Sequence, residues 1–465
     1  MSSVLKKFSR IGYGTARCSV NNQSNLEAIS KALKSNCITV FDTAANYGSG
    51  SSERLIGKVT SEADYDHISI CSKFGYFQIA PEKSGAFPQS FPVAPGHSYC
   101  MHPDFMHHQL NGSLERLNKR KIDVYSVHNP EHLLHQIASE IGQKTANSLA
   151  DGDQTPKDKP IEVPWAQIQP EVEGIFFEKM VDVFMALEER IAEGSISAYG
   201  VSSNALGAPS APGAAQLRWE PLVEAAQAAA RTMGREQPGL AVFALPVNVL
   251  EPGGLAAAAA LWARGYRTVG HRPLTALWDD KVWRLVDKGA ANAPQMYLDA
   301  SRDILEHFTF PMPEGREPTD EEKETAEGCK VLRELIQDLN QRLSSFSSVL
   351  HYDDYLSYKV VPQIADKFAE LDGDSSDKLK AFFETYGTLV RFNCTQTTRQ
   401  LLAGEGCPGG PHLLQEGQSL QDFALRWLLA EGRGKLDTVL VGLPQGRHVD
   451  AALALLGDEE GEGEG

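Results

Sequence analysis

Eight short apolar runs recur along the chain, and amphipathic segments lie between most of them. The runs are rich in Val, Ile and Leu, which is typical of buried strands. The segments between them place apolar residues on one helix face, as the spacing of Leu26, Ile29 and Leu33 illustrates. The eight runs are Ile11–Thr15, Ile38–Phe41, Ile68–Cys71, Ile122–Val127, Ile196–Val201, Leu240–Val249, Thr268–His271 and Thr438–Val441.

This alternation predicts the fold class. Strands that alternate with helices pair in parallel through right-handed crossovers, and eight such units close a barrel. An open doubly wound sheet is the alternative, but the first run lacks the G-x-G-x-x-G loop that typically follows the first strand of such sheets. The sequence therefore predicts an α/β fold, a (β/α)8 TIM barrel.

Two segments interrupt the alternation. Residues 131–179 are polar and contain several prolines, and they predict a long loop insertion after the fourth strand that can include one helix. Residues 276–415 predict a mostly helical insertion after the seventh strand, because loops this long rarely lack structure. Its expected helices are Thr319–Ser345, which starts with acidic residues, and stretches near Val361–Leu371 and Lys378–Tyr386.

The domain organisation follows from these interruptions. The barrel is expected to consist of three stretches, residues 1–130, 180–275 and 416–456. The Gly- and Glu-rich residues 457–465 predict a disordered acidic tail.

The composition limits the partners that we expect. Lys and Arg number 44 against 61 Asp and Glu, and the net charge of −17 argues against binding to nucleic acid or to an anionic membrane. No apolar run reaches the roughly 18 residues of a membrane-spanning helix, and Met1–Arg10 does not lead into a signal-peptide core. Seven scattered cysteines without a C-x-x-C pair suit a reducing compartment. We therefore expect a cytoplasmic protein.

Polar side chains follow three consecutive predicted strands. The second strand leads into Phe41-Asp42-Thr43-Ala44-Ala45-Asn46-Tyr47-Gly48, Lys73 follows the third, and His128 follows the fourth. Because a β/α barrel carries its active site at the carboxyl ends of its strands, we expect Asp42, Tyr47, Lys73 and His128 to converge.

These four groups have complementary chemistry. An ammonium beside a phenol lowers the pKa of the phenol, so Lys73 would activate Tyr47, and Asp42 would keep Lys73 charged and oriented. A neutral His128 would orient a substrate oxygen by a hydrogen bond. Such a set donates a proton to a carbonyl oxygen, and no nucleophile elbow or metal-ligand spacing accompanies it. The attacking species is therefore expected to be a cofactor hydride, and no metal is expected.

At these residues the sequence resembles the aldo/keto reductase family. Its strand-end Asp, Tyr, Lys and His match Asp42, Tyr47, Lys73 and His128. The resemblance implies NADP(H), with NAD(H) as the alternative, and reversible reduction of an aldehyde, ketone or sugar-like carbonyl, with Tyr47 as the proton donor. Further matches are the segments Gly194–Ser203, Arg272–Leu274, Ala424–Trp427 and Val439–Gly442.

The resemblance also implies which residues bind the cofactor. The family usually has a Gln four residues before Asn248 and an aromatic residue two before the Pro-Leu pair, where this chain has Ala244 and His271. The implied cofactor-binding residues are Ser202, Ser203, His271, Arg272, Pro273, Leu274, Gly442, Gln445 and Arg447.

Two functions from different classes follow. The first is an NAD(P)H-dependent reductase of a small-molecule carbonyl, or the reverse oxidation of an alcohol. The second is a non-catalytic barrel that keeps the cofactor site as a redox sensor or regulatory subunit. The sequence does not identify a protein partner for the 276–415 insertion. The complete set of four site residues favours the enzyme.

Overall fold

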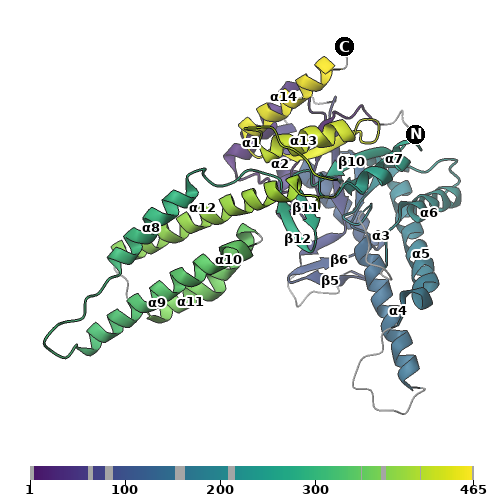
Figure 1. Ribbon diagram of the computed structural model, residues 1–465. Coiled ribbons are helices and arrows are strands. Elements are labelled where there is room, and N and C mark those ends of the chain that lie inside the picture. The colour runs from purple at the N-terminus through teal and green to yellow at the C-terminus, as the bar shows by residue number, and fades with distance from the viewer. Residues whose placement is uncertain are drawn as a thin grey trace. The chain divides into compact units, whose positions relative to one another are not determined.

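The computed structural model describes residues 5–60, 66–78, 87–151, 163–207, 215–346, 348–367, 373–408 and 410–462. The chain divides into two compact units (Figure 1). One comprises residues 1–273 and 426–465, and the other comprises residues 274–425. Each unit has its own buried apolar cluster.

The first unit is a closed barrel of eight parallel strands, which confirms the predicted fold class. Around the barrel the strands follow the order β1-β13-β10-β9-β8-β7-β3-β2. All eight neighbouring strand pairs of the barrel are parallel and have residue-by-residue partners, such as Asp42 with Cys71 and Lys73 with Ser126. The strands are β1 (Ile11–Gly14), β2 (Val40–Asp42), β3 (Ser69–Phe74), β7 (Ile122–His128), β8 (Ile196–Ser202), β9 (Leu240–Pro246), β10 (Arg267–His271) and β13 (Thr438–Gly442).

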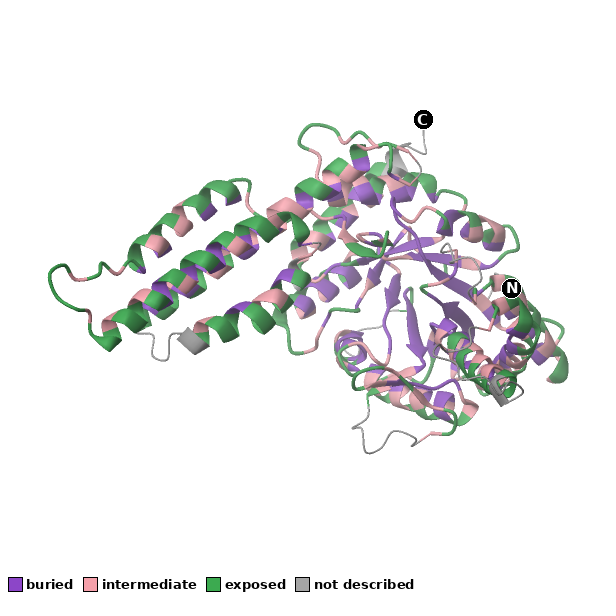
Figure 2. Cartoon of the chain, turned by 60° about the horizontal axis from the view of Figure 1, so that its bottom comes forward, coloured by how far each residue is buried: buried purple, intermediate pink, exposed green. Residues whose placement is uncertain are grey.

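Small and β-branched side chains fill the interior of the barrel. A single buried cluster joins Val40, Val124, Val242, Val269 and Leu440, one from each of five strands. Figure 2 shows the strands buried along most of their length, with helices around them whose outer faces are exposed. Burial on both sides explains why the strands are continuous apolar runs.

Helices follow the strands, as the amphipathic segments predict. Asparagines in the left-handed region end α1 and α3, where Asn36 and Asn118 donate their backbone N–H to helix carbonyls. The helices of this unit include α1 (Gln23–Ser35), α2 (Ser51–Thr60), α3 (Pro103–Leu117), α5 (Trp165–Ala192), α6 (Trp219–Thr232), α7 (Gly254–Trp262) and α14 (Gly446–Glu462), and α13 (Leu420–Glu431) contains the boundary between the two units.

The prediction that residues 131–179 form a loop insertion is wrong. Helix α4 (Glu131–Asp151) begins this segment, and α5 already starts at Trp165. Sparse apolar residues at helical spacing are buried between polar ones in both helices, so the polar composition concealed the stripe. They are Leu134, Ile137 and Ile141 in α4 and Ile168, Val172 and Phe176 in α5.

A small antiparallel sheet, which the sequence patterns did not predict, lies between β3 and α3. It has the order β4-β6-β5, formed by β4 (Tyr76–Gln78), β5 (Phe91–Ala94) and β6 (His97–Tyr99). Strands of three or four residues are too short for a period of two to stand out from the surrounding loop.

The second unit is largely helical, as expected, and starts with a hairpin of β11 (Thr275–Trp278) and β12 (Lys281–Arg284). Helix α9 (Asp320–Arg342) starts where the sequence predicts, because Thr319 and Glu322 form a reciprocal capping box. The other helices are α8 (Ala293–His307), α10 (Val349–Tyr355), α11 (Val361–Lys367) and α12 (Gly373–Ala403), with a π-helical segment η3 (Leu356–Val360) between α10 and α11.

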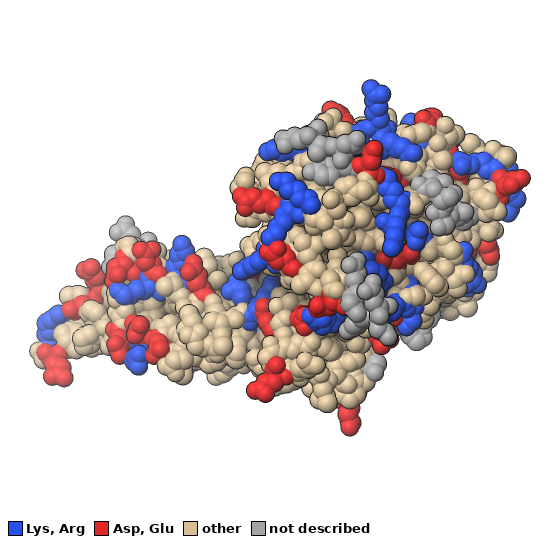
Figure 3. Space-filling view, turned by 90° about the horizontal axis from the view of Figure 1, so that it is seen from above, with Lys and Arg blue, Asp and Glu red and all other residues tan. Residues whose placement is uncertain are grey.

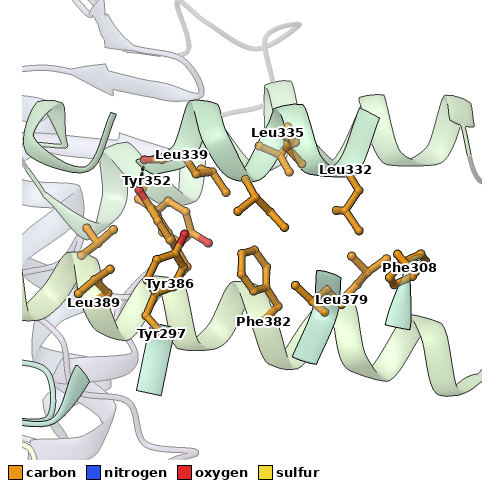
Figure 4. Packing of buried hydrophobic residues seen from close by; sticks show 14 of the residues in the cluster. Tyr297, Phe308, Leu332, Leu335, Leu339, Tyr352, Leu379, Phe382, Tyr386 and Leu389 are labelled. Atoms are coloured by element: carbon orange, nitrogen blue, oxygen red, sulfur yellow. Dashed lines mark hydrogen bonds between the residues drawn. The ribbon is translucent and has the colours of Figure 1, made fainter. Parts of the chain in front are cut away.

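Apolar and aromatic side chains hold these helices together. Leu332, Leu335 and Leu339 of α9 face Leu379 and Phe382 of α12 (Figure 4). Tyr386 donates its hydroxyl to the Leu339 carbonyl at 2.6 Å, so its polar end is satisfied inside the cluster.

The expected disorder of residues 457–465 is wrong in part. Helix α14 continues to Glu462, and residues 463–465 lie outside the described residues. On the face shown in Figure 3, Lys and Arg side chains are interspersed with Asp and Glu. Among the described residues, we find no helix with the length and apolar character needed to span a membrane.

Candidate active site

The four candidate residues come from three neighbouring strands. Asp42 is the last residue of β2, Lys73 lies near the end of β3, and His128 is the last residue of β7. These strands are adjacent in the barrel in the order β7-β3-β2. Tyr47 follows in the β2–α2 loop, which is held against β3 by backbone hydrogen bonds from Thr43 and Ala45. The shared rim therefore brings the four side chains together, as the sequence predicts.

Lys73 is the centre of the site. Its Nζ lies 2.5 Å from Asp42 Oδ1, 2.8 Å from the Thr43 carbonyl oxygen and 3.5 Å from the Tyr47 hydroxyl. The same nitrogen lies 5.0 Å from the centre of the Tyr47 ring. The ammonium therefore joins a buried carboxylate to a phenol.

Glu53 anchors the loop that carries Tyr47. Its side chain is fully buried. The carboxylate accepts a hydrogen bond from the Ser72 hydroxyl at 2.5 Å and forms an ion pair with Arg116 at 2.6 Å. These contacts tie α2 to β3 and α3. A turn with Gly48, Ser49 and Gly50 in the left-handed region joins Tyr47 to this anchor.

The charge state of the site follows from burial and from the ion pair. Burial alone would lower the pKa of Lys73, but Asp42, with smaller contributions from Tyr47 and Cys71, raises that pKa above its usual range, so Lys73 is charged. For Tyr47, burial has the larger effect. It raises the pKa of the phenol, and the positive charge of Lys73 lowers that pKa by less. Lys73 thus acts on Tyr47 in the expected direction, but the net shift is upward.

His128 is neutral. Burial, reinforced by the positive charge of Lys73 and by His271 and His132, lowers the pKa of His128 well below its ordinary value. Its ring lies edge-on to the Tyr47 ring, with centroids 5.9 Å apart. The ring nitrogen Nδ1 is buried and has no hydrogen-bond partner among the described residues.

The comparison with known families finds one family that matches part of the chain. Residues 10–209 match the aldo/keto reductase family, and the match includes all four residues of the cluster. The match covers less than half of the 465 residues and does not reach β9 or the second unit.

Comparison of the structure with solved structures also finds aldo/keto reductases. Glycerol dehydrogenase from Gluconobacter oxydans has 16% identity and a TM-score of 0.41, and the alignment covers 96% of this chain and 85% of that one. An aldo-keto reductase from Bacillus halodurans in its holo form has 14% identity and a TM-score of 0.42, with 97% and 91% covered. An aldo-keto reductase from Klebsiella pneumoniae in complex with NADPH has 17% identity and a TM-score of 0.32, with 58% and 69% covered. No curated protein sequence matches the chain.

Ser202 and Ser203 lie within the residues that match the family, and only Ser202 has a hydroxyl that is not already engaged by three hydrogen bonds. The Ser203 hydroxyl donates to Glu131 at 2.8 Å and accepts from the backbone N–H groups of Ala205 and Leu206. One donor and two lone pairs are all that a hydroxyl has, so this group is already fully used within the chain. Ser202 is buried at the end of β8, where it pairs with His128.

His271 and Arg272 follow at the end of β10. His271 Nε2 lies 3.1 Å from the Ser203 carbonyl, and burial, with the charge of Arg272, lowers the pKa of His271 to about 3. A neutral ring must donate its Nε2–H to that carbonyl, which leaves Nδ1 as an acceptor. Arg272 has a positive φ of 59° and forms an ion pair of 2.7 Å with Glu251. Pro273 is the last residue of this stretch of the first unit, and Leu274 is the first residue of the second.

Sequence reasoning missed two carboxylates, Glu131, which accepts a hydrogen bond from Ser203, and Glu251, which pairs with Arg272. Glu131 is buried and lies three positions after His128, in the stretch His128-Asn129-Pro130-Glu131. Glu251 also accepts a hydrogen bond from Asn248 Nδ2 at 2.7 Å. The only signal in the sequence was an acidic residue shortly after a strand-end polar residue, which is common on helix N-termini.

The remaining cofactor candidates lie after the last strand. Gly442 ends β13, and Gln445 precedes α14, whose second residue is Arg447. All three are exposed. Two side chains fix the backbone of their loop: Tyr13 donates to the Leu443 carbonyl at 2.6 Å, and Asn25 donates to the Pro444 carbonyl at 2.9 Å.

Two further features bear on what the site can bind. A cavity of about 730 Å³ lies beside the cluster and is lined by the β2–α2 loop, β4 and α3, including Asn46, Tyr76 and Phe105. The described residues contain no group of three or more His, Cys, Asp or Glu side chains arranged to hold a metal ion.

Proposed function

We propose that the chain is an NAD(P)(H)-dependent oxidoreductase that transfers hydride between nicotinamide and the carbonyl carbon of an aldehyde, ketone or sugar-like compound. The observation that most supports this proposal is the Asp42–Lys73–Tyr47 contact beside a neutral His128. These residues lie in the segment of the barrel that matches the aldo/keto reductase family. The substrate is a small molecule.

The donor set supports a bound reductant. A phenol, an ammonium and a neutral imidazole can deliver a proton and orient a carbonyl, but none of them can supply two electrons. NADP(H) or NAD(H) supplies the hydride when bound. Ser202, His271 and Arg272 would lie on its nicotinamide side, and the exposed Arg447 would meet the adenosine side, where a 2′-phosphate would favour NADP(H).

In the reduction, the residues of this chain perform three tasks. His128 orients the carbonyl oxygen, and because its Nδ1 lacks a partner, the proton is best placed on Nε2, where it can be donated. As the carbon accepts hydride, the Tyr47 O–H bond breaks and its proton forms the alcohol O–H bond. Lys73, kept charged by Asp42, stabilises the phenolate that remains. The oxidation of an alcohol is the same sequence in reverse.

The test is NAD(P)H consumption, followed by its near-ultraviolet absorbance, with a panel of reactive aldehydes and ketones. Turnover that disappears in Tyr47→Phe, while the cofactor still binds, is the expected result. Cofactor binding without turnover of any carbonyl compound by the unaltered protein would contradict the proposal.

A non-catalytic cofactor-binding barrel, acting as a redox sensor or regulatory subunit, is the second candidate. Two observations favour it. The Ser203 hydroxyl is fully used within the chain, and position 244 is Ala where the family usually has Gln, so two groups that could hold the nicotinamide carboxamide are lost. The same assay separates the two functions, since the sensor binds cofactor and reduces nothing.

A further inference from the structure

The His128 ring lacks the hydrogen bond that usually orients a functional imidazole. Only 8% of the residue is exposed, and its buried Nδ1 has no hydrogen-bond partner among the described residues. In most sites the second ring nitrogen is fixed by a carbonyl or carboxylate, which sets both tautomer and ring rotation. Here the contacts of the ring with its neighbours must set the rotation.

Two tyrosine rings supply those contacts. Tyr47 and Tyr76 both lie nearly perpendicular to the His128 ring, at interplanar angles of 81° and 82°. The centroid distance to Tyr76 is 5.1 Å, against 5.9 Å to Tyr47. Edge-to-face contacts at these distances are attractive and directional. The nearer of the two comes from β4, the short strand that directly follows Lys73, Phe74 and Gly75.

The Tyr76 ring is itself held by its hydroxyl. Asn129 Nδ2 donates to this oxygen at 2.7 Å, and His132 Nε2 lies 2.6 Å from it. Burial lowers the pKa of His132, and in the Nδ1–H tautomer its neutral ring accepts the proton of the Tyr76 hydroxyl. Asn129 directly follows His128, and its backbone N–H donates to the Ser202 carbonyl at 2.7 Å. The anchor is therefore built on the same strand ends as His128.

The neighbouring Tyr99 strengthens this arrangement. It pairs with Tyr76 across β4 and β6, and its hydroxyl donates to the His128 carbonyl oxygen at 2.7 Å. The backbone of His128 is thus fixed by Tyr99, and its ring contacts Tyr76.

We propose that Tyr76 is a positioning residue, which holds the His128 ring in the orientation needed to hydrogen-bond a carbonyl oxygen. The inference rests on the proposed function, and it gives the small β4-β6-β5 sheet a role in the active site.

The kinetic test is a double-mutant cycle with His128. Tyr76→Phe keeps the ring and removes the hydroxyl that contacts Asn129 and His132, and we expect kcat/KM to fall about fivefold. Tyr76→Leu loses the ring as well, and we expect a fall of about 50-fold with an unchanged cofactor Kd. In a His128→Gln background both changes should alter kcat/KM by less than about twofold, because the group on which Tyr76 acts is gone.

A matched control lies in the second unit. Tyr352 donates its hydroxyl to the Phe383 carbonyl at 2.9 Å, so Tyr352→Phe also removes a tyrosine hydrogen bond, and it should keep the unaltered kcat/KM. A full 50-fold loss for Tyr76→Leu in the His128→Gln background would overturn the proposal, because Tyr76 would then act independently of His128. A direct contact between Tyr76 and a substrate in the adjacent cavity would give that result. No loss from either single change would also overturn it.

Nitrogen NMR of the histidine rings in the cofactor-free protein tests the same point without activity. The His128 signals, identified by their loss in His128→Gln, should show one neutral Nε2–H form that shifts or broadens in Tyr76→Leu but not in Tyr352→Phe. Unchanged His128 signals in Tyr76→Leu would refute the positioning role. If the unaltered protein reduces no carbonyl compound, the proposed function fails and these spectra still decide the role of Tyr76. Should Tyr76→Leu lack a cooperative melting transition, Tyr76→Phe is judged by the same two criteria.

Discussion

The ammonium nitrogen of Lys73 lies 3.5 Å from the hydroxyl oxygen of Tyr47, and this contact spans the ends of two neighbouring segments of the barrel rim. Lys73 also pairs with Asp42 at 2.5 Å, so a single side chain couples the charge of a buried carboxylate to the acidity of a phenol. The chemistry proposed for the site depends on this coupling.

Replacing Tyr47 with Phe removes the proposed proton donor and little else. We expect kcat/KM for carbonyl reduction to fall by about 10³-fold, within the range of a lost general acid, while the cofactor Kd is unchanged. Steady-state kinetics and fluorescence titration with NADPH and NADH measure the two quantities. Turnover at the original rate would exclude Tyr47 as the donor.

Lys73→Met should move the pH–rate profile as well as lower the rate. Lys73 lowers the pKa of Tyr47, so its removal raises that pKa further. Reduction needs the protonated phenol, and its basic limb should therefore shift to higher pH. Alcohol oxidation needs the phenolate, and its acidic limb should also shift to higher pH. Because this change leaves Asp42 buried and unpaired, Asp42→Asn/Lys73→Met is the control for lost stability. A profile that falls in height without moving would show that Lys73 does not tune Tyr47.

Glu53→Ala should destabilise the first unit by about 2–4 kcal/mol, because a fully buried carboxylate that links Ser72 and Arg116 is lost. Asp450→Ala removes a pair with Lys31 in which both side chains are about half exposed, and it should cost less than about 0.5 kcal/mol. Denaturant unfolding of both variants measures the difference. Equal effects would mean that Glu53 does not anchor the Tyr47 loop.

Acid should destabilise the protein from about pH 6.5 downward, in part through His271. The pKa of this residue is about 3 in the fold against 6.5 in an unfolded chain, so between these values the unfolded state binds more protons. Stability therefore falls as pH drops through this window. His271→Gln keeps an N–H for the Ser203 carbonyl but does not titrate, and its stability should depend less steeply on pH by up to about 1.4 kcal/mol per pH unit. Identical slopes for the two proteins would contradict the assigned pKa.

Leu339→Ala should weaken the second unit. Leu339 is fully buried in the cluster between α9 and α12, and truncation of such a leucine costs about 2–5 kcal/mol. Leu298→Ala is the control, since Leu298 is 61% exposed and should change stability by less than about 0.5 kcal/mol. Hydrogen exchange of α9 and α12 amides reports the effect locally. Similar exchange in both variants would show that this cluster does not stabilise the unit.

The barrel and the central contacts of the candidate site could be predicted from sequence because they depend on local patterns. Continuous apolar runs predict buried parallel strands, and parallel strands bring their carboxyl ends to one rim whatever the details of packing. Asp42, Lys73 and His128 follow three such runs, so their convergence follows from topology alone. The helix at Asp320–Arg342 was likewise predicted by its cap, which is a contact between residues three positions apart.

Only the tertiary structure decided how these groups are supported and charged. The upward shift of the Tyr47 pKa depends on the amount of burial, which results from packing by many distant residues. The engagement of Ser203 with Glu131 and the contact of Tyr76 with His128 join residues 72 and 52 positions apart, through loops without a recognisable pattern. Local periodicity is readable in a sequence because it repeats along the chain, whereas contacts between single residues across a barrel rim occur once and depend on the whole fold.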